Sequence, residues 1–119
     1  MPDILGHVGL VLIGGVFVHA GIIHFLNFGA VSGMMAAKKL PYPSVLLAAG
    51  SILEIAAGIC LALDVARPWA AWALIAFTVA ASVMLLDFWT REGVERVQMR
   101  SAFSVNVAVV GGLLLAAVG

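Results

Sequence analysis

The chain has 119 residues, which is enough for a single domain spanning residues 1–119. Apolar residues make up 64% and charged residues 10%, whereas a soluble domain is about half apolar and about a quarter charged. A chain this short cannot hide so much apolar surface from water, so composition excludes a soluble globule. The formal net charge is zero, which excludes a basic face for nucleic acid.

Four apolar stretches are long enough, or nearly so, to cross a bilayer, which takes about 20 residues in a helix. The first has no Lys or Arg before its apolar run, unlike a secretory signal, and we interpret it as a retained span. Pro41 and Pro43 break the chain before the second. "DVARPW" makes a tight link before the third, and the charged "TREGVERVQMR" precedes the fourth. The predicted spans are residues 6–28, 44–63, 69–89 and 102–118.

These stretches lack the period-two alternation of barrel strands, and backbone groups in lipid must be paired internally. The sequence therefore predicts an all-α integral membrane protein, an antiparallel four-helix bundle. Basic residues favour the cytoplasmic side of a membrane. Every Lys and Arg residue except Arg67 lies in the first or the third link. We therefore expect those links in the cytoplasm and both termini on the periplasmic side of a bacterial inner membrane. The five residues are Lys38, Lys39, Arg91, Arg96 and Arg100.

Glu54 stands inside the apolar stretch "AAGSILEIAAGICLAL". Gly50, Glu54 and Gly58 are spaced four apart and share one helix face, where small residues let a neighbouring helix approach. We therefore expect Glu54 to point into the bundle. A charge at mid-membrane costs roughly 2.5–3.5 kcal/mol on insertion scales. The carboxyl should therefore be either protonated or held by a partner.

The predicted spans place His19 at about the same depth as Glu54, because a helix rises about 1.5 Å per residue. His19 is therefore the first expected partner of Glu54 and His24 the second. His24 lies nearer the cytoplasmic surface, with Asp87 and Asn106. All five residues form a candidate polar cluster, a ligand or quinone site. The alternative is that they only fasten helices together, at roughly 0.6 kcal/mol per hydrogen bond.

Other chemistry has weaker support in the sequence. Cys60 is the only cysteine, which excludes an internal disulfide and a dithiol couple, and we interpret it as a small apolar helix residue. His7, His19 and His24 share one span and cannot easily sandwich a haem. No metal-ligand spacing, phosphate motif or catalytic nucleophile is recognisable. We expect no metal and no cofactor held by this chain alone; a quinone or lipid from the membrane is the candidate ligand.

Five segments together resemble the DoxX family of small four-helix membrane proteins. They are "AGIIHFLNF", "LPYPSVLLAAGSILEIAAGICLAL", "ARPWAAWAL", "LDFW" and "FSVNVAVVGGLLL". The resemblance implies an association with quinol oxidase or with other quinone-linked redox enzymes at the membrane. Family members often carry Lys, His and Lys where this chain has His24, Leu86 and Val105. These changes favour an accessory role over shared proton or quinone chemistry.

The sequence thus predicts a small, non-catalytic membrane subunit that docks onto a larger membrane complex, and the resemblance implies that this complex carries out redox chemistry. Its partners would be that complex and membrane lipids, with no nucleic acid. The alternative is a quinone- or lipid-binding module, or a small catalytic subunit, with Glu54, His19 and His24 lining a pocket. A solute or proton pathway is a third reading. Close helix packing is expected at Gly50 and Gly58, and docking at faces that carry Gly14, Gly15, Gly111 and Gly112.

Overall fold

The structure, a computed structural model, describes residues 3–119, and every regular element in that part of the chain is a helix. Four helices are long and apolar enough to cross a membrane, so the chain is an all-α integral membrane protein, as the sequence predicts. The elements are α1 (Ile4–Leu26), α2 (Phe28–Ala37), α3 (Pro43–Ala62), α4 (Arg67–Leu85), the 3-10 turn η1 (Phe88–Thr90) and α5 (Gly93–Val118).

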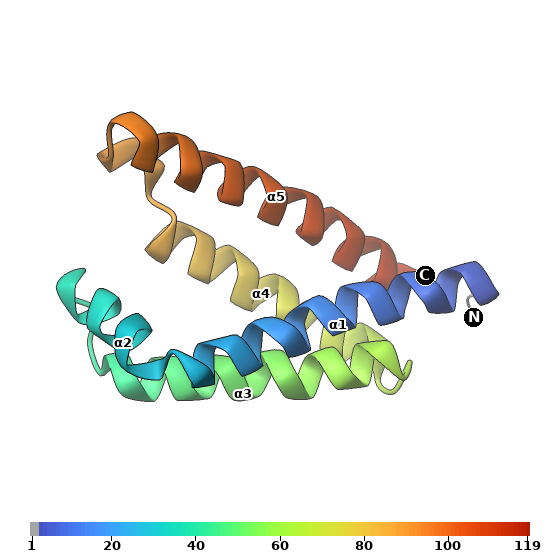
Figure 1. Cartoon of the computed structure of the whole chain (residues 1–119). Coiled ribbons are helices and arrows are strands. Elements are labelled where there is room, and N and C mark those ends of the chain that lie inside the picture. Colours follow the sequence, from blue (N-terminus) through green and yellow to red (C-terminus); the bar gives the residue numbers. More distant parts are fainter. Residues whose placement is uncertain (1–2) are drawn as a thin grey trace.

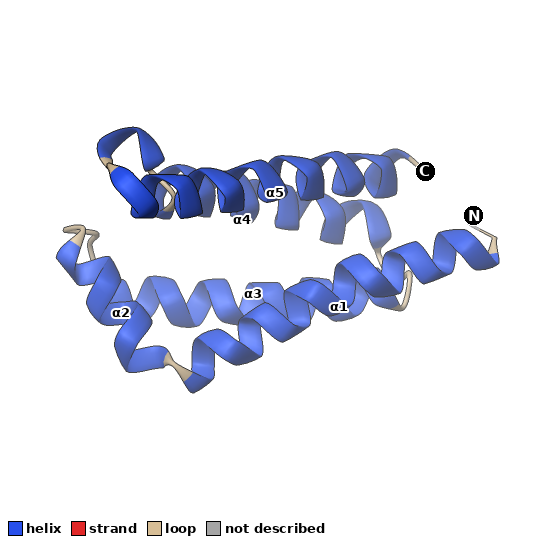
Figure 2. Cartoon of the chain, turned by 45° about the horizontal axis from the view of Figure 1, so that its top comes forward, coloured by secondary structure: helices blue, strands red, loops and turns tan. Residues whose placement is uncertain are grey.

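The long helices form two pairs (Figure 1). α1 packs along α3, α5 packs along α4, and contacts between α3 and α4 join the pairs. α1 and α5 meet only briefly, so the two pairs form two layers that are open on one side (Figure 2). Both chain ends and the α3–α4 link lie at one end of the molecule, here called the termini end. α2 and the α4–α5 link lie at the other, the α2 end.

Buried residues are sorted along the long axis of the bundle. Apolar ones, with Leu61, Leu74 and Leu113 fully buried, fill the half toward the termini end. Met35 and Leu47 are buried toward the α2 end, and the buried polar residues lie toward the middle and that same end. They are Ser51, Glu54, Thr78 and Ser82. The apolar half holds the layers together through packing, while the other half places polar groups between helices.

Three boundaries differ from the sequence prediction. α4 ends at Leu85 rather than at residue 89, and the 3-10 turn η1 follows it. The first link contains a further helix, α2, because the chain breaks at Asn27 and then resumes helical geometry. α5 begins at Gly93, whose φ of 66° starts the helix, rather than near residue 102. The segment after Gly93 carries strong helix formers, so its charges lie on the first turns of a helix instead of in a loop.

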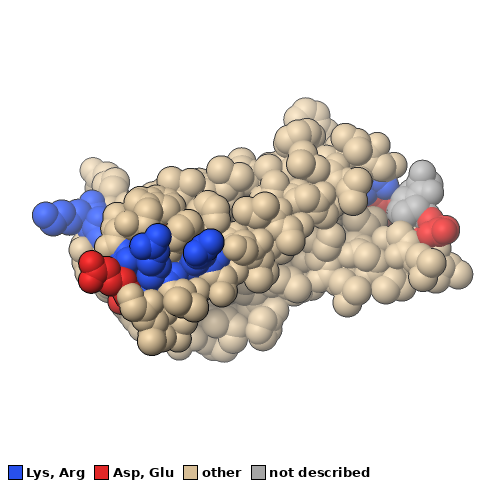
Figure 3. Space-filling model, turned by 90° about the horizontal axis from the view of Figure 1, so that it is seen from above, with Lys and Arg blue, Asp and Glu red and all other residues tan. Residues whose placement is uncertain are grey.

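Charged side chains gather at the two ends of the molecule, and the viewed face between them carries none (Figure 3). The larger group of Lys and Arg lies at the α2 end. At the termini end, Trp69 and Trp72 of α4 are exposed, as in the aromatic belt of a membrane interface. This distribution fits helices that cross a bilayer from one charged end to the other.

Candidate functional site

Two glycines set the spacing between α1 and α3. A side chain on Gly14 would collide with the carbonyl oxygen of Gly58, and a Cβ on Gly58 would lie 2.7 Å from the carbonyl oxygen of Gly14. Two turns further along α1, a Cβ on Gly21 would lie 2.9 Å from the carbonyl oxygen of Ser51. The two backbones are therefore in direct contact over several turns, the close approach that small residues permit.

This contact brings His24 to Glu54. The buried face of α1 carries Leu10, Gly14, Phe17 and Gly21, and His24 continues it three residues later. Nδ1 of His24 lies 2.8 Å from Oε1 of Glu54. Glu54 is 3% exposed, as predicted for a residue that faces the bundle interior, and about a third of the His24 side chain is exposed.

His19 is not the partner of Glu54, contrary to the first sequence expectation. It is exposed on α1, two residues from both Phe17 and Gly21. At 100° per residue, it lies roughly 160° around the helix from that buried face. The depth argument was sound, but depth alone does not say which way a side chain points.

The other two members of the predicted cluster have partners of their own. The Asn106 side-chain amide donates to the hydroxyl of Ser82 at 2.9 Å, which joins α5 to α4. Asp87 accepts from Lys38 at 2.6 Å and from the hydroxyl of Thr90 at 2.9 Å. The structure thus arranges these residues as three separate contacts, each joining different elements, rather than as one layer around Glu54.

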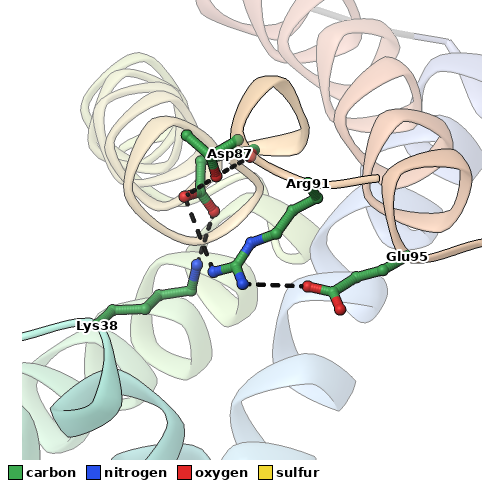
Figure 4. A network of polar contacts seen from close by, with 5 residues as sticks. Lys38, Asp87, Arg91 and Glu95 are labelled. Atoms are coloured by element: carbon green, nitrogen blue, oxygen red, sulfur yellow. Dashed lines mark hydrogen bonds and ion pairs between the residues drawn. The ribbon is translucent and has the colours of Figure 1, made fainter. Parts of the chain in front are cut away.

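The Asp87 contact belongs to an ionic network at the α2 end (Figure 4). Lys38, just after α2, reaches across to Asp87, and Arg91 lies 4.0 Å from the second carboxylate oxygen of Asp87. Arg91 also pairs with Glu95 of α5 at 3.3 Å. The network ties the α2 end of one layer to the α4–α5 link of the other.

Sequence reasoning missed the partners Lys38 and Ser82, and two buried hydroxyls. Ser51 of α3 and Thr78 of α4 are buried without a hydrogen-bond partner among the described residues. The sequence did contain a signal for the buried hydroxyls of α4. Thr78 and Ser82 follow Leu74 at intervals of four, which is the spacing of one buried helix face.

The glycines divide into inward and outward positions. Gly50 packs against the ring of Phe77 of α4, and Gly58 packs against α1, as expected for packing residues. Gly112 lies near Ile13 of α1, so it faces the inside of this chain and not an outer partner. Gly111 has open space where a side chain would stand.

The pair formed by Glu54 and His24 is suited to hold or exchange a proton. A carboxylate with an imidazolium, and a neutral acid with a neutral ring, both carry no net charge, which lowers the cost of placing two titratable groups between apolar helices. The contact uses Nδ1, so Nε2 of the ring is not committed to Glu54. Among residues 3–119, no three His, Cys, Asp or Glu side chains come together as metal ligands would.

The fold and the residues named above can be compared with known proteins. The DoxX family model matches residues 8–87, about two thirds of the chain.

The chain belongs to the DoxX family.

The DoxX match runs from α1 to Asp87 and so includes both Glu54 and His24. Asn106 and the rest of α5 lie beyond it. No curated protein and no solved structure matches the chain significantly.

Proposed function

We propose that this DoxX protein is a small integral membrane subunit that docks onto a larger membrane complex through α5. The observation that supports this most directly is a line of small exposed residues on that helix: Ser101, Ser104, Ala108 and Gly111. They are spaced three or four residues apart and so follow one face. Small residues in such a line let a second membrane helix approach closely.

α5 is also the least buried of the four spanning helices among the described residues. Within the part of the chain that the structure describes, the residues of α5 that are buried lie in its last turns, near the termini end: Leu113, Ala116 and Ala117. Its earlier part packs on α4 and η1 along one side and leaves the small-residue line open. The family resemblance supports a redox complex as the partner, since some members of the family accompany quinone-linked enzymes.

In this reading, the contact between Glu54 and His24 fastens α1 to α3 and so keeps the bundle in the shape that the complex binds. Its catalytic use is the second candidate function, a quinone or proton site. One observation favours that candidate: His24 is partly exposed while its partner is buried, so the ring could pass a proton between Glu54 and a ligand beside α1.

Co-purification from the native membrane distinguishes the two candidates. Gly111→Leu adds bulk to the small-residue line of α5, and Gly15→Leu is the matched control, since Gly15 is an exposed α1 glycine with equally open space. We expect Gly111→Leu to lose the partner complex while Gly15→Leu retains it. Retention by both variants would refute docking through α5.

Glu54→Gln tests the catalytic alternative in the same preparation. The amide keeps the shape of the side chain and a hydrogen bond to His24, so we expect assembly and quinone-linked activity of the complex to survive. Loss of activity with intact assembly would instead favour the quinone or proton site.

A further inference from the structure

A groove of about 420 Å³ opens between α1 and α5 at the termini end. Four residues of α1 between positions 6 and 13, three residues of α5 between 112 and 116, and Gly119 line it, and all of them are glycine or apolar. The lining of α1 covers two turns, so the groove runs about 10 Å along the helix axis. Its volume falls in the range of ligand sites, about 300–1,000 Å³.

Among residues 3–119, Arg67, at the start of α4, is the one charged side chain that lines this groove. Only 15% of the side chain is exposed, although the one ionic contact it makes within the described part of the chain is long: Nη1 lies 3.4 Å from Oδ1 of Asp64. Its Nε is buried and has no hydrogen-bond partner among the described residues. A guanidinium offers five N–H donors, so most of its capacity for an anion is unused here.

The position of Arg67 relative to the membrane suggests the kind of anion. The exposed Trp69 and Trp72 follow directly on α4, and exposed Trp marks the headgroup level of a bilayer. Arg67 therefore lies where lipid phosphates lie, and the glycine and apolar lining of the groove adjoins it. A phosphate on Arg67 with an acyl chain in the groove satisfies both parts of the site.

We propose that the groove between α1 and α5 binds one anionic phospholipid, whose phosphate is held by Arg67 and whose acyl chain lies against the α1 and α5 lining. The occupant fills the space that separates the two helices, and the site makes no use of Glu54, His24 or the outer face of α5. The lipid-site proposal can therefore be tested independently of the docking proposal.

Native mass spectrometry of the full chain in mild detergent tests this directly. The probes are phosphatidylglycerol, diacylglycerol with the same acyl chains, and inorganic phosphate. We expect phosphatidylglycerol to bind about tenfold more tightly than diacylglycerol, and inorganic phosphate alone not to bind, because the site needs both a charge-assisted contact and apolar burial.

Two variants separate those contributions. Arg67→Gln should bring phosphatidylglycerol down to the affinity of diacylglycerol, with Arg96→Gln, an exposed arginine at the α2 end, as the control that changes nothing. Gly9→Leu fills the groove, since a Cβ on Gly9 meets no atom within 4 Å. It should weaken both lipids, while the outward Gly15→Leu weakens neither. Gly9→Ala, a smaller addition, replaces Gly9→Leu if helix content or particle size shows misfolding.

The proposal is wrong if phosphatidylglycerol and diacylglycerol bind equally to the unmodified chain, or if Arg67→Gln leaves their ratio unchanged. It is equally wrong if groove-filling at Gly9 has no effect on either lipid, because the acyl chain would then lie elsewhere.

Discussion

Glu54 shows how far a sequence can place one residue in a membrane bundle. Its burial could be predicted, because a carboxyl between Gly50 and Gly58 shares a face with small residues, and the structure confirms it at 3% exposure. Its partner could not be chosen from depth alone. His19 and His24 differ in their direction around α1, and that direction depends on where the Gly14–Gly58 contact fixes the helix.

His24→Leu should destabilise the protein by about 1–3 kcal/mol, because it leaves the buried Glu54 without its partner. His19→Leu is the control, and its effect should stay within about 0.5 kcal/mol, as is usual for exposed positions. Both are measured as free energies of unfolding in the same detergent. Equal effects of the two variants would contradict the assigned contact.

Glu54→Leu should likewise destabilise by about 1–3 kcal/mol. The double variant Glu54→Leu with His24→Leu should be more stable than the sum of the single effects predicts, since no titratable group is then left unpaired. A double-mutant cycle measures this difference. Strict additivity would mean that the two side chains do not interact in the membrane.

Whole elements were easier to predict than their ends. The four spans follow from apolar length. α2 is apolar but has only 10 residues, which is too short for a span, and the first turns of α5 carry too many charges. Both segments lie at the α2 end, where the ionic network holds them. Side-chain contacts such as that between Lys38 and Asp87 join positions far apart in sequence, and no local pattern indicates them.

Lys38→Met tests the tie between layers. Removing the ammonium group breaks the 2.6 Å contact with Asp87, and we expect a loss of about 1–2 kcal/mol, between the values for exposed pairs and for hydrogen bonds to charged groups. Faster amide hydrogen exchange in α2 and η1 should accompany it. Lys39→Met, which removes a neighbouring exposed charge, should change neither quantity.

Ala66, the residue before α4, has a φ of 50°, in the left-handed region. An L-residue pays about 1–2 kcal/mol for that conformation, and glycine adopts it freely at a smaller entropic cost. Ala66→Gly should therefore stabilise the protein by about 0.5–1 kcal/mol in thermal unfolding. Ala76→Gly, within α4, should destabilise it by a similar amount. A loss of stability in both would indicate that Ala66 does not adopt the left-handed conformation.

For the molecule as a whole, the arrangement of basic side chains bears on its direction in the membrane. We predict the α2 end in the cytoplasm, because five of the six Lys and Arg residues lie in the first and third links. Single cysteines introduced at Lys39 and Val65, both exposed, decide this in a Cys60→Ala background. An impermeant thiol reagent applied from outside should label position 65 only. Labelling of position 39 alone would reverse the direction.

The sequence was sufficient for the fold class because lipid leaves so few choices: apolar length and backbone pairing together require helices. It was not sufficient for the two-layer arrangement, which depends on which glycines allow contact. Gly14 and Gly112 were expected to serve an outer partner, yet both face other helices of the same chain. Gly15 and Gly111 keep outward positions, and of these Gly111 lies on the small-residue line of α5 that the docking proposal uses.

The short link between α3 and α4 has a consequence for biogenesis. On the predicted topology, this hairpin is the internal segment that must be translocated, and its charges, Asp64 and Arg67, lie three residues apart and pair at 3.4 Å. A neutral pair crosses hydrocarbon at far lower cost than two separate ions. α3 and α4 can therefore enter the bilayer together as a preformed hairpin, before α1 and α5 pack against them.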